Sequence, residues 1–193
     1  MKTLQNVLDY WFSKPNDYKK WFFSGTSLDN YIKEEFEELL LEIINNNNES
    51  LIPKNSKEKL AKIILLDQFP RHIYRNTSSA YKYDNMSLKI SLELLDNNSI
   101  NELSAIEQIF ALMPLQHSES IQHKNILLDF ANNKLNTCDV NDKNTYLNFI
   151  EHTTNHKKVL ELFGRYPKRN ICLGLESTPE ELLYIEENKE RQY

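Results

Sequence analysis

The sequence predicts an all-α protein of about eight helices arranged as an antiparallel α/α array. Apolar residues recur three and four positions apart almost throughout, and the alternation typical of strands is nowhere sustained. The 193-residue chain holds only three glycines, which is few for the tight turns of β-hairpins. Residues that start or stop helices stand at the edges of the apolar stripes, among them Ser27 and Gly164.

The first four helices are expected at residues 3–13, 28–45, 56–69 and 78–95. Ser27 is the expected cap of the second helix. Pro70 should end the third, because a proline disfavours helical geometry in the residue before it. Between the first two helices, Trp21, Phe22 and Phe23 are expected to fill the core from a loop.

The fifth helix should follow a capping box formed by Ser99 and Glu102 and should stop at Pro114. The sixth is expected at 118–135, with Ile121, Leu128 and Ala131 facing inward, and the seventh at 143–163. Gly164 is placed to end the seventh helix in a left-handed conformation.

The last helix should begin in the sequence "STPEE" (177–181). Thr178 would be its cap, Pro179 its first residue and Glu181 the second half of a capping box.

Length and composition favour one soluble domain over residues 1–193. The net charge of −5 argues against general nucleic-acid binding, which needs a basic face. No apolar run approaches the roughly 18 residues of a membrane helix, so we expect a cytoplasmic protein with no membrane partner. Cys138 and Cys172 lack metal-type spacing, and no phosphate loop or dinucleotide fingerprint predicts a cofactor.

Three stretches at expected helix ends concentrate polar side chains: "LDQFPRHIYR" (66–75), "PLQHSE" (114–119) and "FGRYPKRN" (163–170). Asp67 continues the apolar stripe of the third helix, and His156 lies on that of the seventh. A buried charge is costly unless it is paired. Asp67 could form a structural ion pair with Arg71 one turn later, and His156 could be an ordinary core histidine. A zinc pair of His152 and His156 is a weaker alternative, because no "HExxH" pattern accompanies it.

Two of these stretches place five cations in two proline-containing corners of an acidic chain. The cations are Arg71, Arg75, Arg165, Lys168 and Arg169. Guanidinium groups match carboxylate and phosphate oxygens, and a histidine supplies a group that titrates near neutral pH. The alternative is that His117, Ser118 and Glu119 only stabilise a helix start.

The same three stretches resemble those of the bacterial family called domain of unknown function 924. Its members carry "LDQFPRNIYR", "ALMPLQHSED" and "FGRFPHRNAILGRESTPEE", and this chain has "LDQFPRHIYR", "ALMPLQHSES" and "FGRYPKRNICLGLESTPEE". The resemblance spans nearly the whole chain and implies an all-helical, tetratricopeptide-like fold without an established activity. This chain departs from the family at His72, Lys168 and Leu175, where Asn, His and Arg are usual.

The leading hypothesis is a small-molecule site that binds an anion carrying phosphate or carboxylate, with hydrolase or transferase chemistry left open. His117 or His156 would be the general acid or base, oriented by Asp67 or Glu119. Arg71, Arg165 and Arg169 would hold the anion, and the remaining ligand-binding residues would be Gln68, Gln116, Ser118 and Asn170. We expect these residues to converge at one site, with no metal.

Two rival hypotheses explain the same residues. One is a helical interaction module that binds a peptide carboxylate on its concave face. The other is a purely structural polar cluster that joins helix corners. Whether the protein is an enzyme, and its oligomeric state, stay open.

Overall fold

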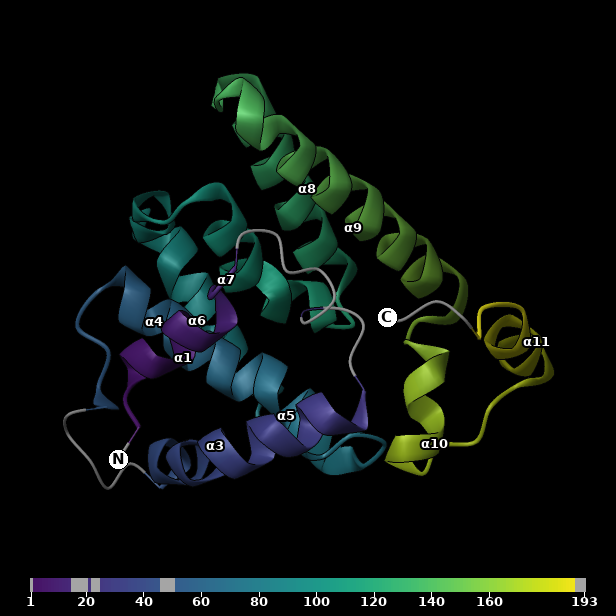
Figure 1. Cartoon of the computed structure of the whole chain (residues 1–193). Coiled ribbons are helices and arrows are strands. Elements are labelled where there is room, and N and C mark those ends of the chain that lie inside the picture. Colours follow the sequence, from purple (N-terminus) through teal and green to yellow (C-terminus); the bar gives the residue numbers. More distant parts are fainter. Residues whose placement is uncertain (1, 15–20, 22–24, 46–50, 190–193) are drawn as a thin grey trace. The chain divides into compact units, whose positions relative to one another are not determined.

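The computed structural model describes residues 2–14, 21, 25–45 and 51–189 of the chain (Figure 1). These residues form helices and no strand, which confirms the all-α prediction. The chain divides into two compact units, residues 1–114 and residues 115–193, and each is described by itself. The single domain over 1–193 stays a prediction. In the part of the chain described, no helix is long and apolar enough to span a bilayer.

The first unit begins with α1 (Leu4–Trp11) and α3 (Thr26–Ile44). Thr3 and Asn6 form a capping box at the start of α1. The prediction that Ser27 caps this helix is wrong, because α3 begins two residues earlier than predicted and Gly25 occupies the cap position without a side-chain bond. Trp21 is buried, as expected, but its backbone is helical and not a loop. Phe22 and Phe23 lie outside the described residues.

The predicted third helix does not end before Pro70. It consists of α4 (Ser56–Ile63), a π-helical turn (Ile64–Gln68) and α5 (Phe69–Ile73). The wide turn restarts the helix at Phe69, whose N–H donates to the Ile64 carbonyl. Pro70 therefore falls in the first turn of α5, where a missing N–H costs little. All five residues of the π-helical turn are buried, and α5 packs on α3.

The predicted fourth helix is a 3-10 helix (Ser78–Tyr81) followed by α6 (Asp84–Asp96). The predicted capping box of Ser99 and Glu102 is wrong, because Ser99–Glu102 forms a 3-10 helix of its own. Instead, the Ser104 N–H donates to the Glu107 carboxylate at 2.9 Å, one residue before α7 (Ala105–His117). Pro114 lies inside α7 and does not stop it.

The second unit contains α8 (Ile121–Thr137) and α9 (Lys143–Phe163), which pack side by side as an antiparallel hairpin (Figure 1). A short 3-10 helix (Val140–Asp142) precedes α9. Gly164 ends α9 with φ of +70°, as predicted. On α8, Ala131 is buried as predicted and Leu128 is half-buried, but Ile121 is exposed and the other buried residues are Lys124 and Leu127.

After Gly164 the chain forms a 3-10 helix (Pro167–Arg169), the short α10 (Asn170–Leu173) and α11 (Pro179–Glu187). Thr178 and Glu181 form the predicted capping box of α11, with Pro179 at its start. Val159, Leu160 and Tyr166 make a small apolar core on which Phe163 and Tyr184 pack. This core fixes α11 beside the end of α9.

Candidate functional site

In the first unit, Asp67 lies in the π-helical turn and is fully buried. Its carboxylate is 3.4 Å from Arg71 Nη1 and accepts a hydrogen bond from the Gln68 amide at 2.5 Å. Arg71 also binds Asp84 through both terminal nitrogens, each at 2.9 Å. The carboxylate on the apolar stripe therefore has the partner that the sequence suggested, and Arg71 holds two carboxylates of its own chain.

A second ion cluster of this unit joins α3 to α5. Arg75 donates two hydrogen bonds to Asp29, at 2.6 and 2.8 Å, and His72 Nδ1 is 2.9 Å from the same carboxylate. Burial would raise the pKa of Asp29, but the bonds from Arg75 and His72 outweigh it and lower that pKa. Burial lowers the pKa of His72. Both clusters stabilise helix contacts within the first unit.

In the second unit, Gln116 links α7 to α9. Its amide nitrogen donates to His156 Nδ1, and its amide oxygen accepts from the Thr153 hydroxyl at 3.1 Å. Because the Gln116 amide nitrogen is a donor, Nδ1 of His156 accepts this bond only when it carries no proton. Burial, and then the charges of His117, Lys124, His152 and Arg169, lower the pKa of His156 to about 3. At neutral pH this imidazole is uncharged.

Lys124 is a residue that the sequence analysis missed. It is fully buried, and its ammonium donates to the carbonyls of Leu115, Gln116 and Ser118 at 2.7, 2.8 and 2.7 Å. Three acceptors match the three N–H groups of a protonated lysine, while burial lowers the pKa of Lys124 to about 7. The signal was present, since Lys124 fills the gap between Ile121 and Leu128 on the expected stripe.

Tyr166, also missed, is the centre of the polar residues of the second unit. Its hydroxyl donates to the Gln116 carbonyl at 3.0 Å, and its backbone N–H donates to Glu119 at 2.8 Å. Three basic groups surround the ring: Arg169 Cζ at 4.6 Å, Lys124 Nζ at 5.8 Å and the His156 ring at 5.4 Å, each measured to the ring centre. Aromatic faces attract cations.

We call Lys124, His156, Arg169 and His117 the basic cluster. His117 belongs to it because its charge acts on His156. Arg169 is 3.9 Å from Glu119 in an ion pair. Ser118 is adjacent in the chain, and its hydroxyl is 2.7 Å from His123 Nδ1. Ser118 does not cap α8, because Ser120 holds that position.

Arg165 and Asn170 face a different partner, Glu181 of α11. Arg165 Nε and Nη2 donate to its two oxygens at 2.6 and 2.8 Å, and the Asn170 amide donates at 3.1 Å. The bonds from Arg165 are the largest cause that lowers the pKa of Glu181 to about 2. Arg165 and Asn170 thus attach α11 to the corner after α9.

The predicted site residues divide between the two units. Asp67, Gln68 and Arg71 belong to the first, and the other eight belong to the second. Their convergence at a single site stays a prediction. The second unit does bring together Gln116, Glu119, His156 and Arg169 through the contacts given above.

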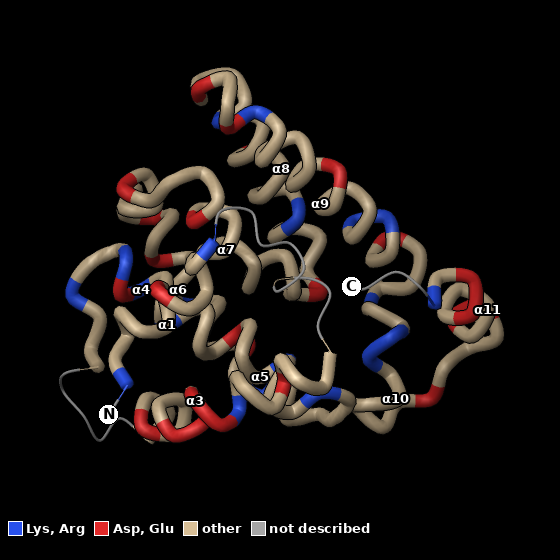
Figure 2. The backbone as a smooth tube through the Cα atoms, viewed as in Figure 1, with Lys and Arg blue, Asp and Glu red and all other residues tan. Residues whose placement is uncertain are grey.

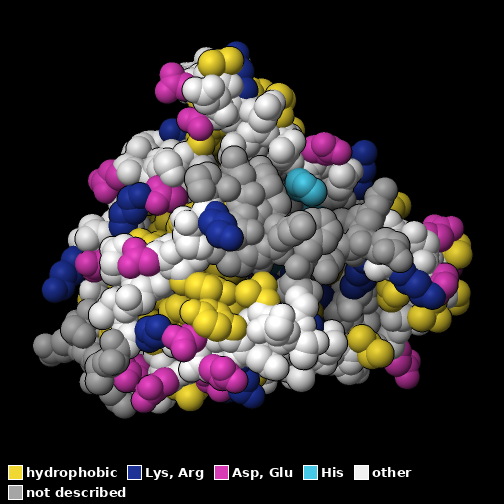
Figure 3. All heavy atoms as spheres, in the orientation of Figure 1, with side chains coloured by type: hydrophobic (Ala, Val, Ile, Leu, Met, Phe, Trp, Pro, Cys, Tyr) yellow, Lys and Arg dark blue, Asp and Glu magenta, His cyan; other side chains and the backbone are white. Residues whose placement is uncertain are grey.

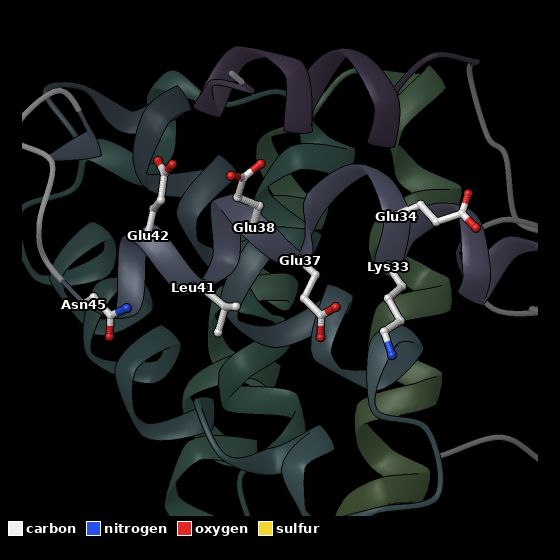
Figure 4. A pocket seen from close by; sticks show the side chains of 7 residues that line it. All are labelled: Lys33, Glu34, Glu37, Glu38, Leu41, Glu42 and Asn45. Atoms are coloured by element: carbon white, nitrogen blue, oxygen red, sulfur yellow. The ribbon is translucent and has the colours of Figure 1, made fainter.

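Among the described residues, no group of three or more His, Cys, Asp or Glu side chains could hold a metal ion. His152, the partner required by the zinc alternative, is exposed on α9. Figure 4 shows a surface depression elsewhere, on α3 of the first unit, lined chiefly by four glutamates with Lys33, Leu41 and Asn45. Its acidic lining contains none of the predicted site residues.

Comparisons with known proteins give a family but no activity. The model of a family described as "Bacterial protein of unknown function (DUF924)" matches residues 7–189. The solved structure of a protein of unknown function, ATU0120, from Agrobacterium tumefaciens is similar to the chain, with a TM-score of 0.79 and 26% identity over 95% of this chain and 97% of that one. No curated protein matches. Because the family model covers nearly all of the sequence, the chain belongs to the bacterial DUF924 family.

Proposed function

We propose that the second unit binds a small anionic molecule through a phosphate or carboxylate group at the basic cluster. The observation that carries this proposal is the gathering of Lys124, Arg169 and His156 around one tyrosine ring, in a chain whose net charge is −5. Two of these groups, Arg169 and the protonated form of Lys124, carry positive charge, and cations brought together in a partly buried place attract anions because the local dielectric is low.

Three arginines of the predicted site differ in their surroundings. Arg71 and Arg165 each direct two nitrogens at one carboxylate within 2.9 Å. Arg169 instead stacks on Tyr166, the ring that Lys124 and His156 also approach, and pairs with Glu119 at 3.9 Å. A guanidinium in this setting suits the two oxygens of an incoming anion. We therefore assign anion recognition to Arg169 and a structural role to Arg71 and Arg165.

The remaining roles follow from charge state. His156 is neutral at physiological pH and its Nδ1 accepts from Gln116, so its other ring nitrogen carries the proton and could donate a hydrogen bond to a bound anion. His117, with Glu119 two residues on, is the candidate for proton transfer if the bound molecule reacts. We extend the proposal to hydrolysis or group transfer on the bound molecule, in the cytoplasm. Gln116 would help to position the ligand through its hydrogen bond to His156.

The proposal is tested by thermal-shift screening against a panel of phosphate and carboxylate compounds. Arg169→Lys keeps the positive charge but loses the paired N–H donors of the guanidinium group. It should therefore abolish the stabilisation by any active compound, while the melting temperature without ligand stays close to that of wild type. Arg165→Lys is the matched control. It should lower the bare melting temperature, because the Glu181 pair is weakened, and keep the ligand-induced shift.

Two results would contradict the proposal. One is a panel in which no anion stabilises the wild type. The other is a compound whose effect survives Arg169→Lys undiminished.

A further inference from the structure

The end of the second unit exposes large aliphatic side chains on two consecutive helices. Leu182 and Leu183 of α11 are 57% and 60% exposed, and Ile171 of α10 is 87% exposed. Leu173 and Leu175, between them in the sequence, are exposed as well. Figure 3 shows hydrophobic side chains on the surface at the places of α10 and α11. Grouped aliphatic residues on a surface commonly mark an interaction site.

The orientation of α11 is fixed by polar contacts, so these leucines cannot simply turn inward. The inward side of the helix carries Glu181 and Tyr184. Glu181 accepts bonds from Arg165, from Asn170 and from the Thr178 N–H at 2.9 Å. A rotation of α11 that buried Leu182 and Leu183 would break these hydrogen bonds. It would also expose Glu181, the buried residue of this helix.

The outward side of α11 combines these leucines with acidic residues. At helical spacing Glu186 lies one turn after Leu182, and Glu187 one turn after Leu183. Glu176 and Glu180 are also exposed. Of the five glutamates between residues 170 and 188, Glu181 is buried against Arg165 and Glu186 pairs with Lys189, which leaves three others. Figure 2 shows the acidic residues along α11.

We propose that this aliphatic and acidic face of α10 and α11 docks a partner protein through an amphipathic helix that carries lysine or arginine beside its leucine-like residues. Charge complementarity selects this occupant. A second copy of the same face would bring glutamates against glutamates, which costs free energy. A helix whose apolar stripe covers the leucines and whose cations meet the glutamates satisfies both features. This inference is independent of the anion site.

The chain offers a matched control on α3. Leu41 is 45% exposed there, and Glu37, Glu38 and Glu42 line the same depression (Figure 4). This surface is acidic but holds a single exposed leucine among its lining residues. A ligand attracted by negative charge alone should bind both faces, whereas the proposed partner helix should distinguish them.

The test uses the full chain and a synthetic 18-residue helical peptide of leucine and lysine, with a peptide of leucine and glutamate in the same pattern as the comparison. Binding is measured by fluorescence anisotropy at physiological salt. We expect saturable binding of the leucine–lysine peptide, no binding of the acidic one, and at least a tenfold weaker affinity in Leu182→Ser/Leu183→Ser. Leu41→Ser should bind like wild type. Ile171→Ser repeats the test at a site outside α11 if the double variant fails to fold.

Three results would overturn the inference. The serine variants could bind the peptide as tightly as wild type, which would mean that charge alone attracts it. The wild type could fail to bind the peptide at all. Light scattering after size-exclusion chromatography could show a dimer that the same serine substitutions dissociate, which would assign the face to a second copy of the chain.

Discussion

Acidification should destabilise the protein through His156 in a predictable amount. The imidazole takes up a proton below its ordinary pKa of 6.5 in the unfolded chain, but only below about 3 in the folded one. Between these values the unfolded state binds more protons, so stability falls as the pH falls. Lowering the pH from 7 to 4.5 should cost roughly 2 to 3 kcal/mol through this residue alone.

Urea unfolding at the two pH values measures this contribution. Asp29 and Glu107, whose pKa values are lowered in the folded protein, also contribute, because their carboxylates begin to take up protons in the unfolded chain as the pH approaches 4.5. The informative quantity is therefore a difference. The free energy of unfolding should fall by roughly 2 to 3 kcal/mol more in wild type than in His156→Gln, which has no imidazole to protonate at this position.

Asn148→Ala is the control, because Asn148 is on the same helix, exposed and not ionisable, and this variant should respond to acid like wild type. Equal losses in wild type and His156→Gln would refute the reasoning. So would an NMR titration that places the pKa of His156 near 6.5. Either result would mean that the imidazole is hydrated and that its bond with Gln116 does not persist in solution.

Two further substitutions test the buried charges. Lys124→Met leaves the carbonyls of Leu115 and Ser118 without their donor and should lower the free energy of unfolding by about 2 kcal/mol. Each lost buried hydrogen bond costs roughly 1 to 3 kcal/mol, and part of this is offset because the variant no longer buries a charge. Lys158→Met, at an exposed position of α9, should change it by less than about 0.5 kcal/mol, and equal values for the two variants would contradict the prediction. Asp67→Ala should cost about 3 kcal/mol, the low end for breaking a buried pair, because Arg71 keeps Asp84. A melting temperature within a degree or two of wild type would show that the Asp67 carboxylate is not a buried partner.

The sequence predicted helices well where local chemistry decides their ends. Gly164 and the Thr178–Glu181 capping box act within one turn of the chain, and both are confirmed. The two prolines misled the prediction because their effect depends on the backbone around them. A π-helical turn moves Pro70 into a helix start, and α7 continues through Pro114. Apolar periodicity does not reveal such a turn.

The sequence identified polar residues of the candidate site but not which of them would contact one another. Polar residues on apolar stripes pointed to Asp67 and His156, and the same rule would have found Lys124. It could not tell that Arg165 would bind Glu181, sixteen residues away, while Arg169 would stack on Tyr166. That choice depends on where α11 packs, and the packing of α11 depends on contacts that no local pattern encodes.

Anion binding by the basic cluster is tested most directly by NMR of the histidine side chains during a titration with inorganic phosphate, and then with acetate, at constant ionic strength. The account predicts that the imidazole signals of His117 and His156 shift saturably with at least one of these anions and not with chloride. The same titration of Arg169→Lys should leave both signals in place. Signals that stay unmoved in wild type, or that move equally with chloride or in Arg169→Lys, would contradict the claim that Arg169 and its neighbours form an anion site.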